Sequence, residues 1–455
     1  MNMEQKSPTV LGKEPIGKLL IQYSIPAIIA MTASSLYNMI DSIFIGHGVG
    51  PLAISGLALT FPLMNLSAAF GSLVGVGAST LMSVKLGQKD YQTAQKVLGN
   101  VILLNLIIGA IYTVIMFIFL DDVLKIFGSS PDTHGYAKDF MEIILAGNIV
   151  THSYLGLNSV LRASGHPKQA MMATILTVVI NAILAPLFIF VFGWGIRGAA
   201  SATIIAQVIS LAWQFHTFLD KRELIHIQRG IFKLKRKIVV NSISIGMAPF
   251  LMNLASCFIV ILINLGLKKH GGDLAIGAYG IVNRIAFLFI MIVLGFNQGM
   301  QPIAGYNYGA RLYGRVIEVL KKTIFLATCA TTAGFLISEL IPGLVVNIFT
   351  TDHELTAIAA RGLKIVLMFY PIVGFQMVTS NFFQCIGMAK KAIFLSVTRQ
   401  CLFLIPCLII LPNFWGQDGV WFSMPLCDFV ASLLAFFMLR REIRKFKSGN
   451  VKATI

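Results

Sequence analysis

The chain has 455 residues, of which 56% are hydrophobic and only 12% are charged. A soluble domain carries about 25% charged residues, so this composition excludes an ordinary water-soluble fold. The net charge of +17 does not indicate nucleic acid, because the Lys and Arg residues form short clusters between long apolar runs and no continuous basic face. The composition therefore predicts an all-α integral membrane protein.

Apolar runs recur along the whole chain, and each is long enough to cross a bilayer, which takes about 20 residues. We expect twelve transmembrane helices, near residues 19–45, 51–80, 97–120, 140–161, 169–192, 199–219, 239–267, 274–305, 323–349, 362–386, 391–412 and 419–439.

Positive charge falls on alternate connections between these runs. About three quarters of the 36 Lys and Arg residues share one side, together with the amino terminus, the segment 221–237 and residues 440–452. Because Lys and Arg concentrate in cytoplasmic loops, we expect both termini in the cytoplasm. The protein is predicted to be a multi-pass protein of the cytoplasmic (inner) membrane.

The two halves of the chain resemble each other at a constant offset, at which Gly77 meets Gly299 and Gly165 meets Gly387. This offset predicts two six-helix bundles, related by a pseudo-two-fold axis along the membrane normal, with a cavity between them. We expect an amino-terminal lobe at 1–219, a basic cytoplasmic linker at 220–238 and a carboxy-terminal lobe at 239–455.

The sequence lacks the marks of catalysis. There is no GxxxxGK[ST] loop for a nucleotide, and no set of nucleophile, base and orienting group stands out. We therefore expect no enzyme activity and no cofactor. An ion gradient, of protons or of sodium ions, has to drive any active transport.

One acidic residue lies well inside a predicted span of the first half, namely Asp41 in YNMIDSIFIG. A carboxylate within the bilayer is a functional candidate by default, and burial allows a carboxyl to bind and release a proton near neutral pH. The alternative is a hydrogen-bonded packing residue. Tyr37 and Asn38 share the helical face of Asp41 and, with Asn158, are candidates for lining a substrate cavity.

Two further polar residues, Asn181 and Thr203, lie in the fifth and sixth predicted spans. Their oxygens would either coordinate a hard monovalent cation such as sodium or adjust a proton site near Asp41. The alternative is hydrogen bonding that only packs helices together. We expect no other metal site.

Three charged residues fall in spans of the second half, namely Arg284, Arg399 and Asp428. An unpaired charge inside a bilayer is unfavourable, so we expect a polar network that holds the second lobe together. Direct contact with the substrate is the alternative.

Several short motifs resemble one known family, and they occur in its order. They are IP followed by Asp41 and IGHG, then LRASGHPK, NAILAPLFIF, GIRGAASAT, QGMQPIAGYNYGA, FFQCIGMAKKA, the pair Arg399-Gln400 and GVWFSMPLCD. Over nearly its whole length the chain resembles the multidrug and toxic compound extrusion (MATE) transporters, and among them the MepA-like branch.

This resemblance implies a V-shaped pair of six-helix bundles that alternates between outward-open and inward-open states and exchanges drugs for protons or sodium ions. By position, Asp41, Asn181 and Thr203 resemble the cation site of the family's amino-terminal lobe. The chain departs from the family at Ala185, where relatives often have Asp, and this departure puts a complete sodium site in doubt. It also has Asn253 and Pro371 in regions where other branches carry acidic residues.

Together these features predict a multidrug efflux antiporter, a protein of antibiotic resistance, that exports amphipathic organic cations in exchange for protons or, as the second choice, for sodium ions. The runner-up is a flippase for a lipid-linked or amphiphilic substrate, and a channel is third. The expected partners are small-molecule drugs and the lipid bilayer, with no nucleic acid, and the protein is expected to be a monomer.

Overall fold

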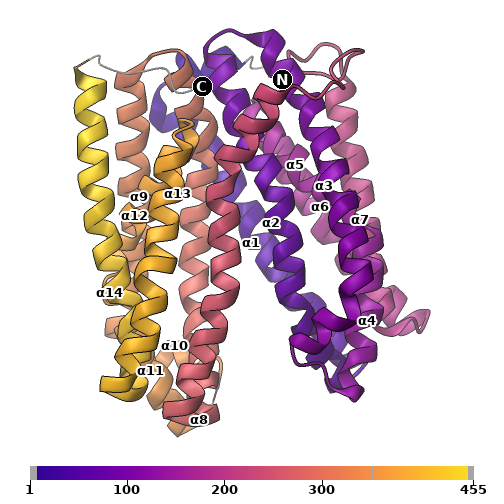
Figure 1. Ribbon diagram of the computed structural model, residues 1–455, viewed down its shortest axis with the longest axis vertical. Coiled ribbons are helices and arrows are strands. Elements are labelled where there is room, and N and C mark those ends of the chain that lie inside the picture. The colour runs from indigo at the N-terminus through magenta and orange to yellow at the C-terminus, as the bar shows by residue number, and fades with distance from the viewer. Residues whose placement is uncertain (1–7, 351, 449–455) are drawn as a thin grey trace. The chain divides into compact units, whose positions relative to one another are not determined.

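The computed structural model describes residues 8–350 and 352–448, without the side chains of residues 8, 38, 39, 51 and 273. These residues form helices joined by turns, and the described part contains no strand (Figure 1). The all-α fold expected from the composition is confirmed.

The helices follow one another in chain order. They are η1 (Pro8–Gly12), α1 (Ile16–Gly48), α2 (Pro51–Gly87), α3 (Tyr91–Ile126), α4 (Pro131–Ala146), α5 (Asn148–Ala163), α6 (Pro167–Pro186), η2 (Leu187–Val191), α7 (Gly195–Leu219), α8 (Arg236–Gly309), α9 (Tyr313–Leu340), α10 (Pro342–Asn347), α11 (His353–Leu367), α12 (Tyr370–Cys385), α13 (Ala389–Val397), η3 (Thr398–Leu404) and α14 (Ile405–Lys447).

These helices make up the twelve predicted crossings. In the described part of the chain, nine helical stretches are long and apolar enough to cross a bilayer alone. The pairs α4 with α5 and α11 with α12 form two more spans, bent by 57° and 52°. One of the nine stretches, Ala389–Lys447, holds two crossings because the backbone turns at Gly416, where φ is 56°. Glycine adopts this left-handed conformation without steric cost.

Most helices extend beyond the apolar runs from which they were predicted. The helix α3 begins at Tyr91, ahead of the predicted start at residue 97, because the side chain of Asp90 accepts a hydrogen bond from the backbone N–H of Thr93 at 3.1 Å. A reciprocal capping box between Ser130 and Thr133 starts α4. Such caps satisfy backbone donors outside the bilayer, where hydropathy gives no signal.

The described chain forms two compact units, and the boundary between them passes inside α1 and α8. The first unit contains residues 8–13 and 29–250, and the second contains residues 14–28, 251–350 and 352–448. The first half of α1 therefore packs in the second unit, and the beginning of α8 packs in the first. Pro26 and Pro249 lie next to these boundaries. The repeat boundaries proposed at 219 and 239 remain a prediction.

Two glycines allow the beginning of α8, residues 236–250, to pack closely against α2 within the first unit. A Cβ atom on Gly77 would lie 1.8 Å from the carbonyl oxygen of Ser242, and one on Gly246 would lie 1.8 Å from the carbonyl oxygen of Leu73. Neither position has room for a side chain. The two backbones cross in direct contact.

The first part of α1, residues 16–28, crosses the later part of α8 in the same way within the second unit. A Cβ atom on Gly299 would lie 2.7 Å from the backbone nitrogen and Cα of Ser24, and one on Gly295 would lie 2.8 Å from the Cα of Ile28. Gly299 is the residue that corresponds to Gly77 of the first unit at the repeat offset. The internal repeat is thus visible in the packing of each unit by itself.

A surface ion pair also recurs in the two units, with its charges exchanged. In the first, Arg197 Nη2 lies 2.7 Å from Asp139 Oδ1, which joins the start of α7 to α4. In the second, Arg361 Nη2 lies 2.5 Å from Asp418 Oδ2, which joins α11 to the second part of α14. At the repeat offset Asp139 meets Arg361, and Arg197 falls next to the position that meets Asp418. Each pair fixes the same end of its bundle.

Candidate functional site

Three helices of the first unit bring together Tyr37, Asn181 and Thr203. The hydroxyl of Tyr37 on α1 lies 2.9 Å from Thr203 Oγ1 on α7. Asn181 on α6 donates through Nδ2 to Tyr37 at 3.1 Å and to Thr203 at 3.0 Å. Thr203 also hydrogen-bonds the carbonyl oxygen of Ala199, one turn earlier, at 3.1 Å. The three side chains form a closed hydrogen-bonded triangle between the helices.

Asp41 follows Tyr37 by one helical turn on α1, on the same face of the helix. It is 8% exposed, and its Oδ1 is buried without a hydrogen-bond partner among the described residues. Ala185 occupies the next turn after Asn181 on α6 and is fully buried. The residues of this region thus provide one carboxyl group next to neutral hydroxyl and amide groups. The side chain of Asn38 lies outside the described residues.

The local sequence explains why α6 can present Asn181. The helix ends at Pro186, and the chain continues as the π-helical segment η2. Proline removes one helix hydrogen bond, and π-helical turns frequently accompany functional positions. Asn181 is 1% exposed and would be costly to bury without the partners that Tyr37 and Thr203 provide.

Asn158 takes part in a different set of contacts. On α5, its Nδ2 donates to the carbonyl oxygen of Ala170 at 2.9 Å, and its Oδ1 accepts a hydrogen bond from Arg162. No hydrogen bond of the described structure joins it to the triangle. Asn158 connects α5 to α6, and its assignment to a substrate cavity stays a prediction.

In the second unit, Arg399 and Asp428 form the pair that the sequence suggested. Nε and Nη2 of Arg399 both lie 2.8 Å from Asp428 Oδ1. Arg399 lies in the π-helical segment η3, and Asp428 is 8% exposed on α14. At the repeat offset Arg399 corresponds to Thr177, which donates to Ser210 at 2.7 Å in the first unit. Both bundles therefore have a polar link at this level.

Arg284 does not join this pair. Its side chain is exposed on α8 and makes no hydrogen bond or ion pair within residues 8–350 and 352–448. An exposed arginine side chain can pack its apolar stem along the helix while its charged group stays solvated. The structure thus places two of the three expected residues together.

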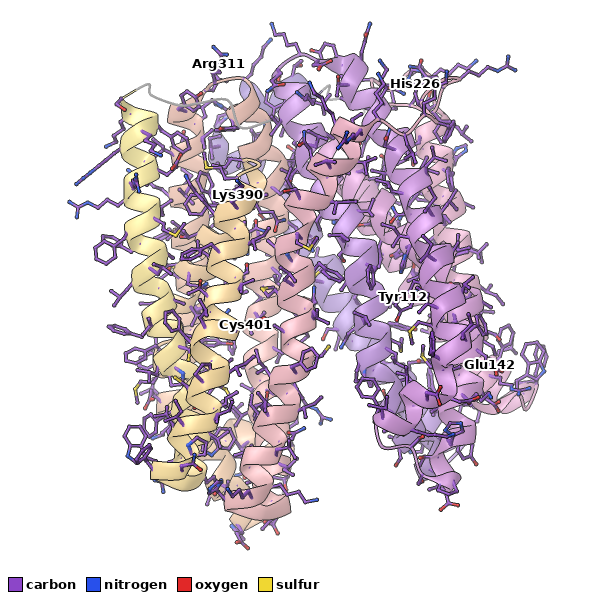
Figure 2. The ribbon with its side chains drawn as sticks, in the orientation of Figure 1. Tyr112, Glu142, His226, Arg311, Lys390 and Cys401 are labelled. Carbon is purple, nitrogen blue, oxygen red and sulfur yellow. The ribbon has the colours of Figure 1, made fainter. Side chains whose placement is uncertain are left out.

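A further polar group, not expected from the sequence, is buried between α2, α3 and α5. Ser67 donates to Asn148 Oδ1 and lies 3.2 Å from Nε2 of the fully buried His152. Tyr112, labelled in Figure 2, has its ring centroid 6.0 Å from that of His152, and its hydroxyl donates to the carbonyl oxygen of Leu63 at 3.0 Å. Asn148 and His152 are one helical turn apart, so they share one helix face. The four-residue spacing of Asn148 and His152 is the feature of the sequence that could have indicated this polar group.

Comparison with known proteins agrees with this arrangement. The family model described as MatE matches residues 26–187 and 245–410, one segment in each half of the chain. The chain is 26% identical over 427 residues to "Multidrug export protein MepA" of Staphylococcus aureus (strain MSSA476), covering 94% of both proteins. It is 28% identical over 429 residues to the protein of the same name from Staphylococcus haemolyticus (strain JCSC1435), covering 93% of both.

Solved structures show the same fold. A structure titled "Outward-facing conformation of a multidrug resistance MATE family transporter of the MOP superfamily" matches with a TM-score of 0.91 and 25% identity, covering 98% of this chain and all of the other. "Crystal structure of MATE in the bent conformation" matches with a TM-score of 0.92 at 25% identity, covering 98% and 99%. The family match spans well over half of the sequence, and the chain belongs to the MATE family of multidrug efflux transporters.

Proposed function

We propose that this protein exports amphipathic organic cations in exchange for protons by alternating access, and that Asp41 carries the coupling proton. Tyr37, Asn181 and Thr203 form the neutral part of the site. The observation that supports this role is the buried carboxyl oxygen of Asp41 without a partner, one helical turn from a closed triangle of hydrogen bonds. A proton on Asp41 would neutralise a charge that is costly in this position.

The composition of the site favours a proton over sodium. The hydroxyls of Tyr37 and Thr203 and the amide nitrogen of Asn181 already hydrogen-bond one another. Sodium is a hard cation that needs several oxygen ligands and gains from added negative charge. Ala185 supplies no carboxylate where relatives often have Asp. Sodium is the less favoured coupling ion, and Asp41, Asn181 and Thr203 are the residues that would hold it.

The orientation follows from the distribution of charge. Lys and Arg are concentrated at one end of the helices, at the connections that include the segment 221–237 and the end of α14. By the positive-inside rule that end faces the cytoplasm, with both termini. Protons then enter down their gradient while drug leaves. The inward movement of one charge through roughly 150 mV supplies about 3.5 kcal/mol, enough to sustain a drug gradient of about a hundredfold.

The test uses sealed vesicles that contain the purified protein and a labelled organic cation, with a pH gradient imposed in the absence of sodium. We expect the wild type to transport the cation and Asp41→Asn, which fixes the site in a neutral form of similar shape, to lose gradient-driven transport. Asp132→Asn makes the same chemical change at an exposed carboxylate and is the matched control. It should transport like the wild type.

Other outcomes would contradict parts of the proposal. Undiminished transport by Asp41→Asn would remove this residue from the coupling mechanism. Transport by the wild type only when sodium is present would overturn the choice of ion. Movement of a fluorescent phospholipid between leaflets without transport of the cation would instead favour a flippase.

A further inference from the structure

The segment between α7 and α8, residues 220–235, folds against the first unit. Ile225 and Ile231 are each 3% exposed and anchor it. Glu223 Oε2 lies 3.0 Å from Nε2 of His166, and the backbone N–H of Ile227 donates to the carbonyl oxygen of Phe218 at 2.7 Å. His226, labelled in Figure 2, belongs to this segment. The connection between the two halves is therefore ordered and packs on one bundle. We call residues 220–235 the strap.

One buried amide brings the end of the strap to the beginning of α3. The side chain of Asn100, which is fully buried, donates through Nδ2 to the carbonyl oxygens of Lys96 at 2.8 Å and Lys233 at 3.1 Å, and accepts from the backbone N–H of Lys235 at 2.9 Å. The neighbouring Gly99 permits the approach, because a Cβ atom there would lie 2.3 Å from the carbonyl oxygen of Ile231. The fold itself therefore gathers three lysines.

None of the three lysines, Lys96, Lys233 and Lys235, has a carboxylate in ion-pair contact among the described residues, and the latter two are exposed. The charge of Lys96 lowers the pKa of Lys235 from its ordinary value. The carboxylate of Asp90, the N-cap residue of α3, accepts a hydrogen bond from Thr93, and the charges of Lys85 and Lys96 help to lower its pKa. One carboxylate does not balance three lysines. Like charges that a rigid contact holds side by side are stabilised by an anion.

Apolar residues alternate with the lysines in the same stretch of the strap. Phe232 is 44% exposed and Leu234 is 47% exposed, next to Lys233 and Lys235. Basic residues interleaved with exposed aromatic and aliphatic side chains, at the end of membrane-spanning helices, match the lipid headgroup region of a bilayer. A soluble anion would leave Phe232 and Leu234 in water.

We propose that Lys96, Lys233 and Lys235 bind the phosphate of an anionic phospholipid, while Phe232 and Leu234 enter the interface of the leaflet at this end of the helices. The lipid would tie the strap and α3 to the membrane surface. Because the strap joins the two repeats, its attachment fixes one bundle relative to the bilayer and leaves the start of α8 as the connection to the other half of the sequence. This site is separate from the residues proposed to couple transport.

The experiment titrates the full-length protein in mild detergent with fluorescently labelled phosphatidylglycerol and, in parallel, with labelled phosphatidylcholine. A lysine near an anionic lipid contributes about a fivefold gain in affinity. We expect the wild type to prefer phosphatidylglycerol, and the triple variant Lys96→Gln, Lys233→Gln, Lys235→Gln to lose at least about tenfold of that affinity. Replacement of the same three lysines by Arg should retain it.

The matched control removes the same charge from other exposed positions of the strap, by Lys221→Gln, Arg222→Gln and Arg229→Gln. It keeps Asn100 and its three hydrogen bonds, and should bind within about twofold of the wild type. An equal loss in the control would show that only net charge matters and would overturn the site. Displacement of the labelled lipid by equal concentrations of inorganic phosphate would overturn the assignment to a lipid.

Discussion

The crossing of α2 and α8 in the first unit gives a prediction whose size can be worked out from the structure. In Gly77→Ala, the new Cβ atom would lie 1.8 Å from the carbonyl oxygen of Ser242 and 2.7 Å from its carbonyl carbon. Carbon atoms do not approach an oxygen nearer than about 3 Å, so α2 and the start of α8 have to separate by about 1.2 Å. Backbone atoms cannot rotate away as a side chain can. We expect a loss of about 1–3 kcal/mol in the free energy of unfolding, the cost of overpacking.

The measurement is thermal unfolding of the purified protein in detergent, followed by intrinsic tryptophan fluorescence. Gly280→Ala is the control, because a Cβ atom there has no neighbour within 4 Å and the residue also lies inside α8. Alanine is the better helix former by about 1 kcal/mol, so this variant should be as stable as the wild type or more so. A Gly77→Ala protein that unfolds at the wild-type temperature would refute the close crossing of these two backbones.

Three further outcomes are expected. Asp90→Ala removes the cap that accepts a hydrogen bond from Thr93 and should lower the free energy of unfolding by about 1 kcal/mol, measured by thermal unfolding. The hydrogen bond and the nearby lysines outweigh burial and lower the pKa of Asp90. The contribution of Asp90 to stability is therefore present above its ordinary pKa of 3.8 and is lost as the pH falls further, so the wild type and the variant should converge in acid. Asp139→Arg and Arg197→Asp should each lower the thermal unfolding temperature slightly, and the double variant should recover it, because the second unit carries the reversed arrangement. An equally unstable double variant would contradict the pairing. Thr203→Val should impair proton-driven export in vesicles because two hydrogen bonds of the triangle are lost, whereas Thr203→Ser retains both, and equal activity of the two variants would argue against the triangle.

The architecture was largely predictable, because hydrophobic length and the spacing of Lys and Arg reflect the bilayer directly. Helix ends were not, since caps such as Asp90 and Ser130 lie outside the apolar runs. The proximity of Asn181 and Thr203 follows from tertiary packing, and the sequence suggested it only through their polarity within spans. The structure adds the third partner, Tyr37, as a direct hydrogen-bond neighbour of both.

Other parts of the polar interior lacked a distinct signal. Arg284 and Arg399 look alike in sequence, as charges within apolar runs, yet one is exposed and the other pairs with Asp428. The helix face that each side chain occupies decides the difference, and apolar segments with little periodicity do not reveal it. A single histidine in an apolar run, such as His152, is equally consistent with packing and with function, so the sequence alone does not mark it.

The packing of the first part of α1 in the second unit has a consequence for the synthesis of the protein. Ser24 emerges early from the ribosome, but its close neighbour Gly299 is made only after the whole first half of the chain. At about 5–20 residues per second, the first half of α1 waits roughly 15–55 s for the helix against which it packs. During that interval only its hydrophobicity and its covalent continuation into the first bundle hold it in place. Completion of the second bundle is therefore coupled to a segment that entered the membrane first, and the tight glycine crossing at Gly299 forms late in biogenesis.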